Sequence, residues 1–160
     1  MAEPEGNGHL LRVVLDDESM PSLSPMQDAD RRQALADLAA ENRFALVDHP
    51  HRPTVLHLSV QDGRLMFDVR SADNVSLQIF LLAPGPFRAL VRDYQMLLES
   101  YAAAIAEGRE ARIQAIDMGR RGLHNEGAEL VIARLAGKVV LDFETARRLF
   151  TLIAVLHRRL

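Results

Sequence analysis

The feature that most constrains the fold is a pair of alternating apolar runs on either side of Asp62-Gly63. Alternation with a period of two is typical of β-strands with one buried face, and Asp-Gly is a strong signal for a two-residue hairpin turn. The apolar members are Leu56, Leu58 and Val60 before the turn, and Leu65, Phe67 and Val69 after it. A two-residue turn pairs them in reverse order, so all of them lie on one face of the predicted hairpin.

A third alternating run extends this hairpin into a predicted three-strand meander. Its apolar members are Val75, Leu77, Ile79 and Leu81. An odd number of loop residues keeps the apolar faces of the strands together. The loop 72–74 satisfies this requirement, and Asn74 is suited to a left-handed backbone. We therefore expect Leu77 opposite Val69 and Ile79 opposite Phe67.

The opposite face of the meander is predicted to be polar. It carries a cross-strand row of His57, Asp68 and Gln78, in which the first two are interpreted as a charge pair. Met66 and Phe80 lie on the same predicted face, which indicates that another segment or a second chain partly covers it.

Four helices are predicted from apolar stripes of helical spacing and from capping signals. They begin at Ser24, which precedes Pro25, and at Phe87, Arg109 and Asp142. The helix that begins at Phe87 has the longest uninterrupted amphipathic pattern, so we expect it to be the main cover of the sheet. Short apolar runs at residues 10–15 and 139–141 predict two further strands at the sheet edges.

These elements predict one α+β domain with a mostly antiparallel sheet, in which about four helices cover one face. Residues 1–9 are polar and form a predicted disordered tail, which leaves residues 10–160 as the single domain. The last helix has a wide apolar stripe that includes Leu149, Leu152 and Val155. Such a stripe is typical of burial on two sides, and a second subunit in a homodimer would cover the second side.

Composition argues against several classes of function. The formal net charge of −3 argues against charge-driven binding of nucleic acid. The chain has no cysteine, which excludes disulfides, thiolate-bound metals and cysteine nucleophiles. No apolar run approaches the roughly 18 residues of a membrane span, and Glu3 and Glu5 are unlike the start of a signal peptide. We therefore expect a cytoplasmic protein that does not enter a membrane.

The densest group of polar residues lies between Ile116 and Gly127, within a stretch that also contains three glycines. Two interpretations are open. If the stretch is one helix, Asp117 and Arg121 form an i,i+4 ion pair and Gly127 allows close approach of a neighbouring element. If the helix breaks at the first two glycines and restarts near Asn125, its free amides and the arginines make a cradle for phosphate or carboxylate.

The candidate ligand-binding residues are Asp117, Arg120, Arg121, His124, Asn125 and Glu126. One hypothesis is a binding or adaptor protein in which the two arginines and His124 hold an anionic ligand or a protein partner's carboxylates. The alternative is an enzyme acting on a phosphorylated or carboxylated small molecule. There the arginines clamp the anion, while His124 and Glu126 or Asp117 move protons. The enzyme requires these side chains to converge in a concave pocket, and no catalytic residue follows from the sequence.

No metal or cofactor is expected. His49, His51 and His57 have no carboxylate at a diagnostic spacing. Ser59, His57 and Asp68 share a predicted sheet face, but Ser59 is in mid-strand, unlike the exposed elbow of a serine nucleophile. The sequence contains neither a P-loop nor a dinucleotide-binding glycine motif.

Several longer motifs carry a family resemblance. They are Glu41-Asn42-Arg43-Phe44, the segments 56–59, 64–70 and 116–127, and Asp142 through Phe150. Together they resemble the bacterial uncharacterised protein family 0262, over about residues 10–157. The resemblance implies a small cytoplasmic bacterial protein. It implies no assigned activity, so no catalytic or binding residue is carried over.

Overall fold

The computed structural model describes residues 6–16 and 23–157. The strands are β1 (Leu10–Leu15), β2 (Phe44–Leu46), β3 (Thr54–Gln61), β4 (Arg64–Arg70), β5 (Ser76–Leu82) and β6 (Val139–Leu141). The helices are α1 (Pro25–Ala40), α2 (Gly85–Glu107), α3 (Glu110–Leu135) and α4 (Phe143–Leu156). A four-stranded sheet has the order β1-β3-β4-β5 and is antiparallel except for the β1–β3 pair. The predicted α+β class with a mostly antiparallel sheet is confirmed.

The hairpin formed by β3 and β4 has the predicted register. Val60 lies opposite Leu65, Leu58 opposite Phe67, and Leu56 opposite Val69. Asp62 and Gly63 both have positive φ, at 51° and 75°, as a tight hairpin turn that matches the strand twist requires.

The predicted register of β5 is wrong by one residue. Phe67 pairs with Phe80 rather than Ile79, because the pairing shifts at a bulge between Val69 and Arg70. An extra residue at a bulge exchanges the two faces of the strand beyond it. Phe80 and Leu82 are therefore buried, whereas Val75, Ile79 and Leu81 are exposed. Only Leu77 of the predicted apolar row packs against the core.

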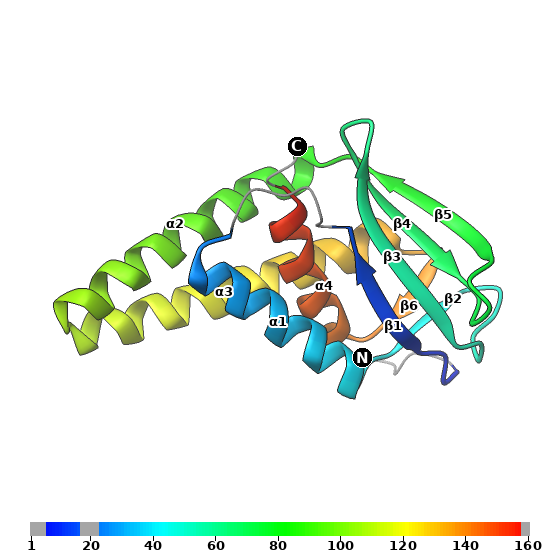
Figure 1. Ribbon diagram of the computed structural model, residues 1–160, viewed down its shortest axis with the longest axis horizontal. Helices are drawn as coiled ribbons and strands as arrows, with labels where there is room; N and C mark the ends of the chain where they lie inside the picture. Colours follow the sequence, from blue (N-terminus) through cyan, green and yellow to red (C-terminus); the bar gives the residue numbers. More distant parts are fainter. Residues whose placement is uncertain (1–5, 17–22, 158–160) are drawn as a thin grey trace.

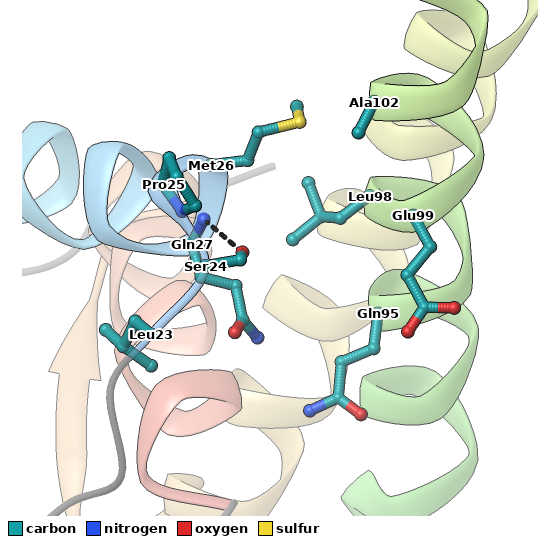
Figure 2. Close-up of a pocket in the computed structure, with 9 residues that line it drawn as sticks. All are labelled: Leu23, Ser24, Pro25, Met26, Gln27, Gln95, Leu98, Glu99 and Ala102. Carbon is teal, nitrogen blue, oxygen red and sulfur yellow. Dashed lines mark hydrogen bonds between the residues drawn. The ribbon is translucent and has the colours of Figure 1, made fainter.

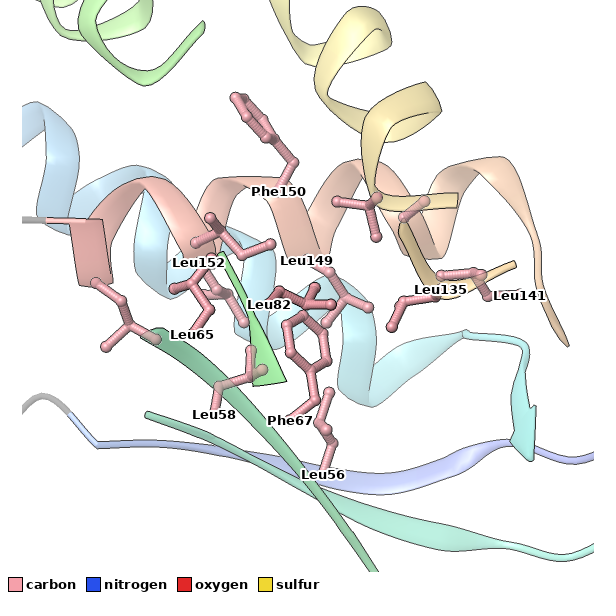
Figure 3. Close-up of a cluster of buried hydrophobic side chains, with 14 of the residues drawn as sticks. Leu56, Leu58, Leu65, Phe67, Leu82, Leu135, Leu141, Leu149, Phe150 and Leu152 are labelled. Carbon is pink, nitrogen blue, oxygen red and sulfur yellow. The ribbon is translucent and has the colours of Figure 1, made fainter. Parts of the chain in front are cut away.

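Helix α4, rather than α2, lies against the apolar face of the sheet. Ten of its side chains are buried, compared with five on the longer α2. Figure 3 shows Leu149 and Leu152 of α4 directed at Leu58 and Phe67 of the sheet. Helices α1 and α3 also contact α4, so its wide apolar stripe is buried within one chain. The stripe is thus buried on two sides, as predicted, but it gives no support for a second subunit, and the homodimer stays a prediction.

The sequence suggested that the short strand β6 joins an edge of the main sheet, and this prediction is wrong. Strand β6 pairs antiparallel with β2, a strand that was not predicted, in a separate two-stranded sheet. Residues 6–9 fall within the predicted tail, yet Gly8 donates to the Pro50 carbonyl at 2.8 Å and accepts from Phe44 at 3.1 Å. Residues 1–5 lie outside the described residues, and the tail there stays a prediction.

The helix ends follow the predicted signals. The Ser24 hydroxyl accepts a hydrogen bond from the Gln27 amide at 3.2 Å, and Asp142 accepts one from Thr145 at 3.0 Å. Gly108 ends α2 in a left-handed conformation. Helices α2 and α3 form an antiparallel pair that extends away from the sheet, and α1 lies alongside α4 (Figure 1). None of the described helices is both long and apolar enough to span a membrane.

Candidate functional site

The glycine-rich stretch is helical throughout. Helix α3 runs from Glu110 to Leu135 without a break, so the alternative with a restart near Asn125 is wrong and there is no cradle of free amides. Gly127 has the packing role of the helical interpretation, because a Cβ there would overlap the ring of Phe150 on α4. Gly122 has open space around it, and we have no packing explanation for it.

Four of the six predicted site residues line one cleft of about 370 Å³. They are Asp117, Arg120, Arg121 and His124, at positions i, i+3, i+4 and i+7 of α3, a spacing that places them on one helix face. Helix α1 contributes the same spacing on the facing wall, with Asp30, Gln33, Ala34 and Asp37. The remaining lining residues are Arg147, Arg148 and Thr151 of α4 and Tyr101 of α2.

Asp30 connects three helices at one end of the cleft. It accepts a short hydrogen bond from the Tyr94 hydroxyl of α2 and lies 3.7 Å from the Arg120 guanidinium of α3. The Arg120 guanidinium also lies 5.7 Å from the centroid of the Tyr101 ring, within the range of a cation–π contact. Burial, together with the adjacent Asp30, raises the pKa of Tyr94. Tyr94 therefore stays protonated and acts as a hydrogen-bond donor.

His124 lies between aromatic rings at the base of the site. Its ring centroid is 5.0 Å from that of Tyr94 and 6.1 Å from that of Phe150. Its Nε2 is buried and has no hydrogen-bond partner among the described residues. The pKa of His124 is lowered to about 4, mainly by burial; Asp30 opposes this shift, and Arg120, Arg147 and Arg148 add to it. The imidazole is therefore neutral at neutral pH.

The α4 wall of the cleft carries two arginines that share Glu144 as a partner. Arg148 lies 3.8 Å from Glu144 and binds Asp37 of α1 at 3.0 Å, and Asp37 also accepts from Gln33 at 2.8 Å. Arg147 binds Glu144 at 2.9 Å through one terminal nitrogen. Its Nε is buried without a partner in the described part of the chain. Arg147 thus keeps donor capacity that no described residue uses.

Two predicted site residues lie elsewhere. Asn125 and Glu126 are exposed and are not part of the cleft lining. The predicted ion pair between Asp117 and Arg121 is also not formed, since no ion pair or hydrogen bond joins either side chain to another described residue. The charges of Asp117 and Arg121 therefore remain available to a ligand.

The polar face of the sheet does not contain the predicted charge pair. His57 lies opposite Asp68, as predicted, but the two do not form a charge pair. The Asp68 carboxylate accepts from Arg70 at 2.8 Å and from Ser76 at 2.7 Å. Burial lowers the pKa of His57, with Arg70 adding to the effect, so this histidine is neutral. Among the described residues, no cluster of three or more histidine or carboxylate side chains is suited to hold a metal ion.

The model of the Uncharacterised protein family (UPF0262) matches residues 7–159. The chain belongs to the UPF0262 family. It is 73% identical over 155 residues to a UPF0262 protein of Acidiphilium cryptum, and the aligned region covers 97% of this chain and 96% of that relative. It is 58% identical to a UPF0262 protein of Granulibacter bethesdensis over 94% of this chain and 90% of the relative.

The UPF0262 match confirms the family predicted from the sequence and assigns no activity. A UPF0262 protein of Rhodopseudomonas palustris is 46% identical over 96% of this chain and 94% of its own length. No solved structure matches the chain. The function of this UPF0262 member therefore has to be inferred from its own side chains.

Sequence reasoning identified only four of the twelve residues that line the cleft of this UPF0262 member. The missed charged residues are Asp30, Asp37, Arg147 and Arg148. A signal was present, since the two aspartates are seven residues apart on α1 and share a face. The sequence does not predict that this face of α1 is directed at α3 and α4, because its orientation depends on how the helices pack around α4.

A second hollow lies where the start of α1 faces α2 (Figure 2). It has a volume of about 650 Å³ and is lined mainly by Pro25, Met26, Leu98 and Ala102, with Glu99 as its one ionisable lining residue among those described. It is larger than the cleft of α3, but it lacks convergent charged groups. Binding sites combine apolar walls with a few placed polar groups, and we assign no ligand to this hollow.

Proposed function

We propose that this UPF0262 member is a cytoplasmic binding protein whose cleft between α1, α3 and α4 holds a small oxyanion, either a carboxylate or a phosphate. The observation that carries the proposal is the convergence of Arg120, Arg121, Arg147 and Arg148 on one cleft. Guanidinium groups present a planar set of donors that matches carboxylate and phosphate oxygens.

Unused donors support a ligand rather than a closed internal network. Buried polar nitrogens in proteins nearly always have a partner. His124 Nε2 and Arg147 Nε are buried without one among the described residues. Arg121 is exposed and makes no ion pair with a described residue. Four arginines against three aspartates also leave the cleft lining with an excess of positive charge.

The size of the cleft favours a small ligand over a protein partner's surface. Small-molecule sites typically have volumes of roughly 300–1,000 Å³, and the cleft has about 370 Å³. Its polar groups also come from different helices. Such an arrangement surrounds a compact ion better than it matches a flat partner surface.

The enzymatic alternative has weaker support. Its proton carriers were His124 with Glu126 or Asp117, but Glu126 is exposed and outside the cleft lining. The pKa of His124 is lowered to about 4, so the imidazole is uncharged at neutral pH, which makes it a poor general acid and a weak base. Efficient general acid–base catalysis needs a pKa near the working pH. Binding is therefore the function that we propose.

Thermal melting against inorganic phosphate, pyrophosphate, succinate and citrate tests the proposal. A ligand at about a hundred times its dissociation constant stabilises the folded state by about 2.7 kcal/mol, so at least one of these anions should raise the melting temperature of the wild type. Arg121→Gln should weaken the binding of that anion about tenfold or more, since hydrogen bonds to charged groups contribute about 1.5–3 kcal/mol.

Two matched variants serve as controls. Arg112→Gln removes an exposed arginine of α3 that is outside the cleft lining, and it should leave binding unchanged. Asp117→Asn removes an unpaired carboxylate from the cleft and should strengthen anion binding. If none of the anions shifts the melting temperature, or if Arg112→Gln weakens binding as much as Arg121→Gln, the proposal is wrong.

A further inference from the structure

Strand β5 forms an open edge of the four-stranded sheet. Within the described part of the chain, the backbone of Ser76–Leu82 pairs with β4 and with no other segment. Figure 1 shows β5 on the outer side of the sheet, away from the helices. One row of its backbone N–H and C=O groups is therefore available to another strand.

The composition of β5 makes this edge suited to pairing. Its sequence, Ser-Leu-Gln-Ile-Phe-Leu-Leu, contains no charge, no proline and no glycine. Ile79 and Leu81 are 51% and 48% exposed. Natural proteins usually protect an open edge with charges, proline, bulges or a covering element. The bulge opposite Val69 and Arg70 lies at the start of β5, and the rest of the strand is regular.

The other edge of the same sheet is protected. Strand β1 carries Arg12 in an exposed position. The Asn42 side chain binds the Leu10 backbone twice, accepting from its N–H at 2.6 Å and donating to its carbonyl at 2.9 Å. Helix α1 also packs beside β1. The absence of protection is thus a property of β5 and not of the whole sheet.

We propose that β5 pairs antiparallel with β5 of a second copy of the chain, which joins two sheets into one eight-stranded sheet across a twofold axis. A twofold axis at an edge strand generates antiparallel self-pairing, and it closes the assembly at a dimer. Ile79 is the midpoint of Ser76–Leu82, so an axis at that position sets Ile79 opposite its own copy and Leu81 opposite the partner's Leu77.

Self-pairing suits this strand because the strand carries no charge. When a strand pairs with its own copy across a twofold axis, any charged residue can lie opposite a like charge, and this arrangement is destabilising. An uncharged strand meets no such penalty against its own copy. The pairing also covers exposed Ile79 and Leu81 with the apolar side chains of the same strand. A second copy therefore fits this edge better than a partner recognised through charge.

Sedimentation velocity over a wide range of concentrations tests the proposal. The wild type should populate a dimer as concentration rises. Ile79→Lys places two ammonium groups against each other at the axis and should give a monomer at every concentration. Ile105→Lys is the matched control, since Ile105 is 52% exposed on α2, and this variant should dimerise like the wild type. Far-UV circular dichroism checks that both variants fold, as expected for exposed positions.

Cross-linking tests the register of the pairing. Because the chain has no cysteine, Ile79→Cys introduces a single thiol. Directly opposite cross-strand Cβ atoms lie about 4.5–5.5 Å apart, near the range that a disulfide bridges after a small shift. Mild oxidation should yield a covalent dimer of Ile79→Cys and not of Ile105→Cys. A wild type that stays monomeric, a dimer that persists in Ile79→Lys, or equal cross-linking of the two cysteine variants would each overturn the proposal.

Discussion

At the residue scale, His124 shows how local surroundings decide the role of a polar group. The sequence identified His124 as a candidate proton carrier, because an exposed histidine titrates near neutral pH. In the structure its ring is packed between Tyr94 and Phe150, and burial lowers its pKa to about 4. The burial of a single side chain depends on tertiary packing, so this outcome could not be predicted from residue type and spacing.

The lowered pKa of His124 predicts a dependence of stability on pH. The unfolded chain binds a proton near pH 6.5, whereas the folded chain binds it only near pH 4. The stability that neutral His124 contributes is therefore fully present above pH 6.5 and is lost as the pH falls from 6.5 towards 4. His124→Gln removes this titration.

Urea unfolding of both proteins across this range provides the measurement. The difference in unfolding free energy, wild type minus His124→Gln, should decrease by roughly 1 kcal/mol per pH unit between these limits. His57 and His157 are present in both proteins, so their contributions cancel. A difference that does not change with pH would show that His124 is not buried as described.

At the element scale, patterns of local origin predicted well and patterns of tertiary origin did not. The register of β3 and β4 follows from the Asp62-Gly63 turn, and the helix starts follow from Ser24 and Asp142. The face of β5 was predicted wrongly because a bulge at Val69 and Arg70 shifts the pairing. The sequence does not signal this bulge, because β5 has apolar residues at both alternating sets of positions and either set could face the core.

The close contact of α3 with α4 gives a prediction about glycine. Gly127→Ala places a methyl group into the Phe150 ring, and overpacking of this kind costs about 1–3 kcal/mol. Gly122→Ala, on the same helix but with open space at its Cβ position, should instead stabilise the protein by up to about 1 kcal/mol. Thermal unfolding of the two variants measures both effects. Equal shifts in the same direction would contradict the packing of Gly127 on Phe150.

At the scale of the whole molecule, the cleft results from packing that no single element determines. Helix α4 lies against the sheet, and α1 and α3 pack on it from other sides. This arrangement places the charged face of α1, with Asp30 and Asp37, opposite the charged face of α3. Four of the six candidate residues that the sequence singled out on α3 line this cleft, because polar residues cluster there at helical spacing. The sequence gave no basis for adding α1 and α4, because no local pattern states how these helices pack beside α3.

The central claim is that this cleft binds a small oxyanion, and nuclear magnetic resonance tests it most directly. Proton–nitrogen correlation spectra of the ¹⁵N-labelled protein would be recorded during titration with phosphate and with succinate. The account predicts saturable shifts for at least one anion, concentrated at residues 30–37, 117–124 and 147–151 and at the arginine Nε signals. Shifts scattered over the surface without saturation, or confined to the hollow near Met26 and Leu98, would contradict it.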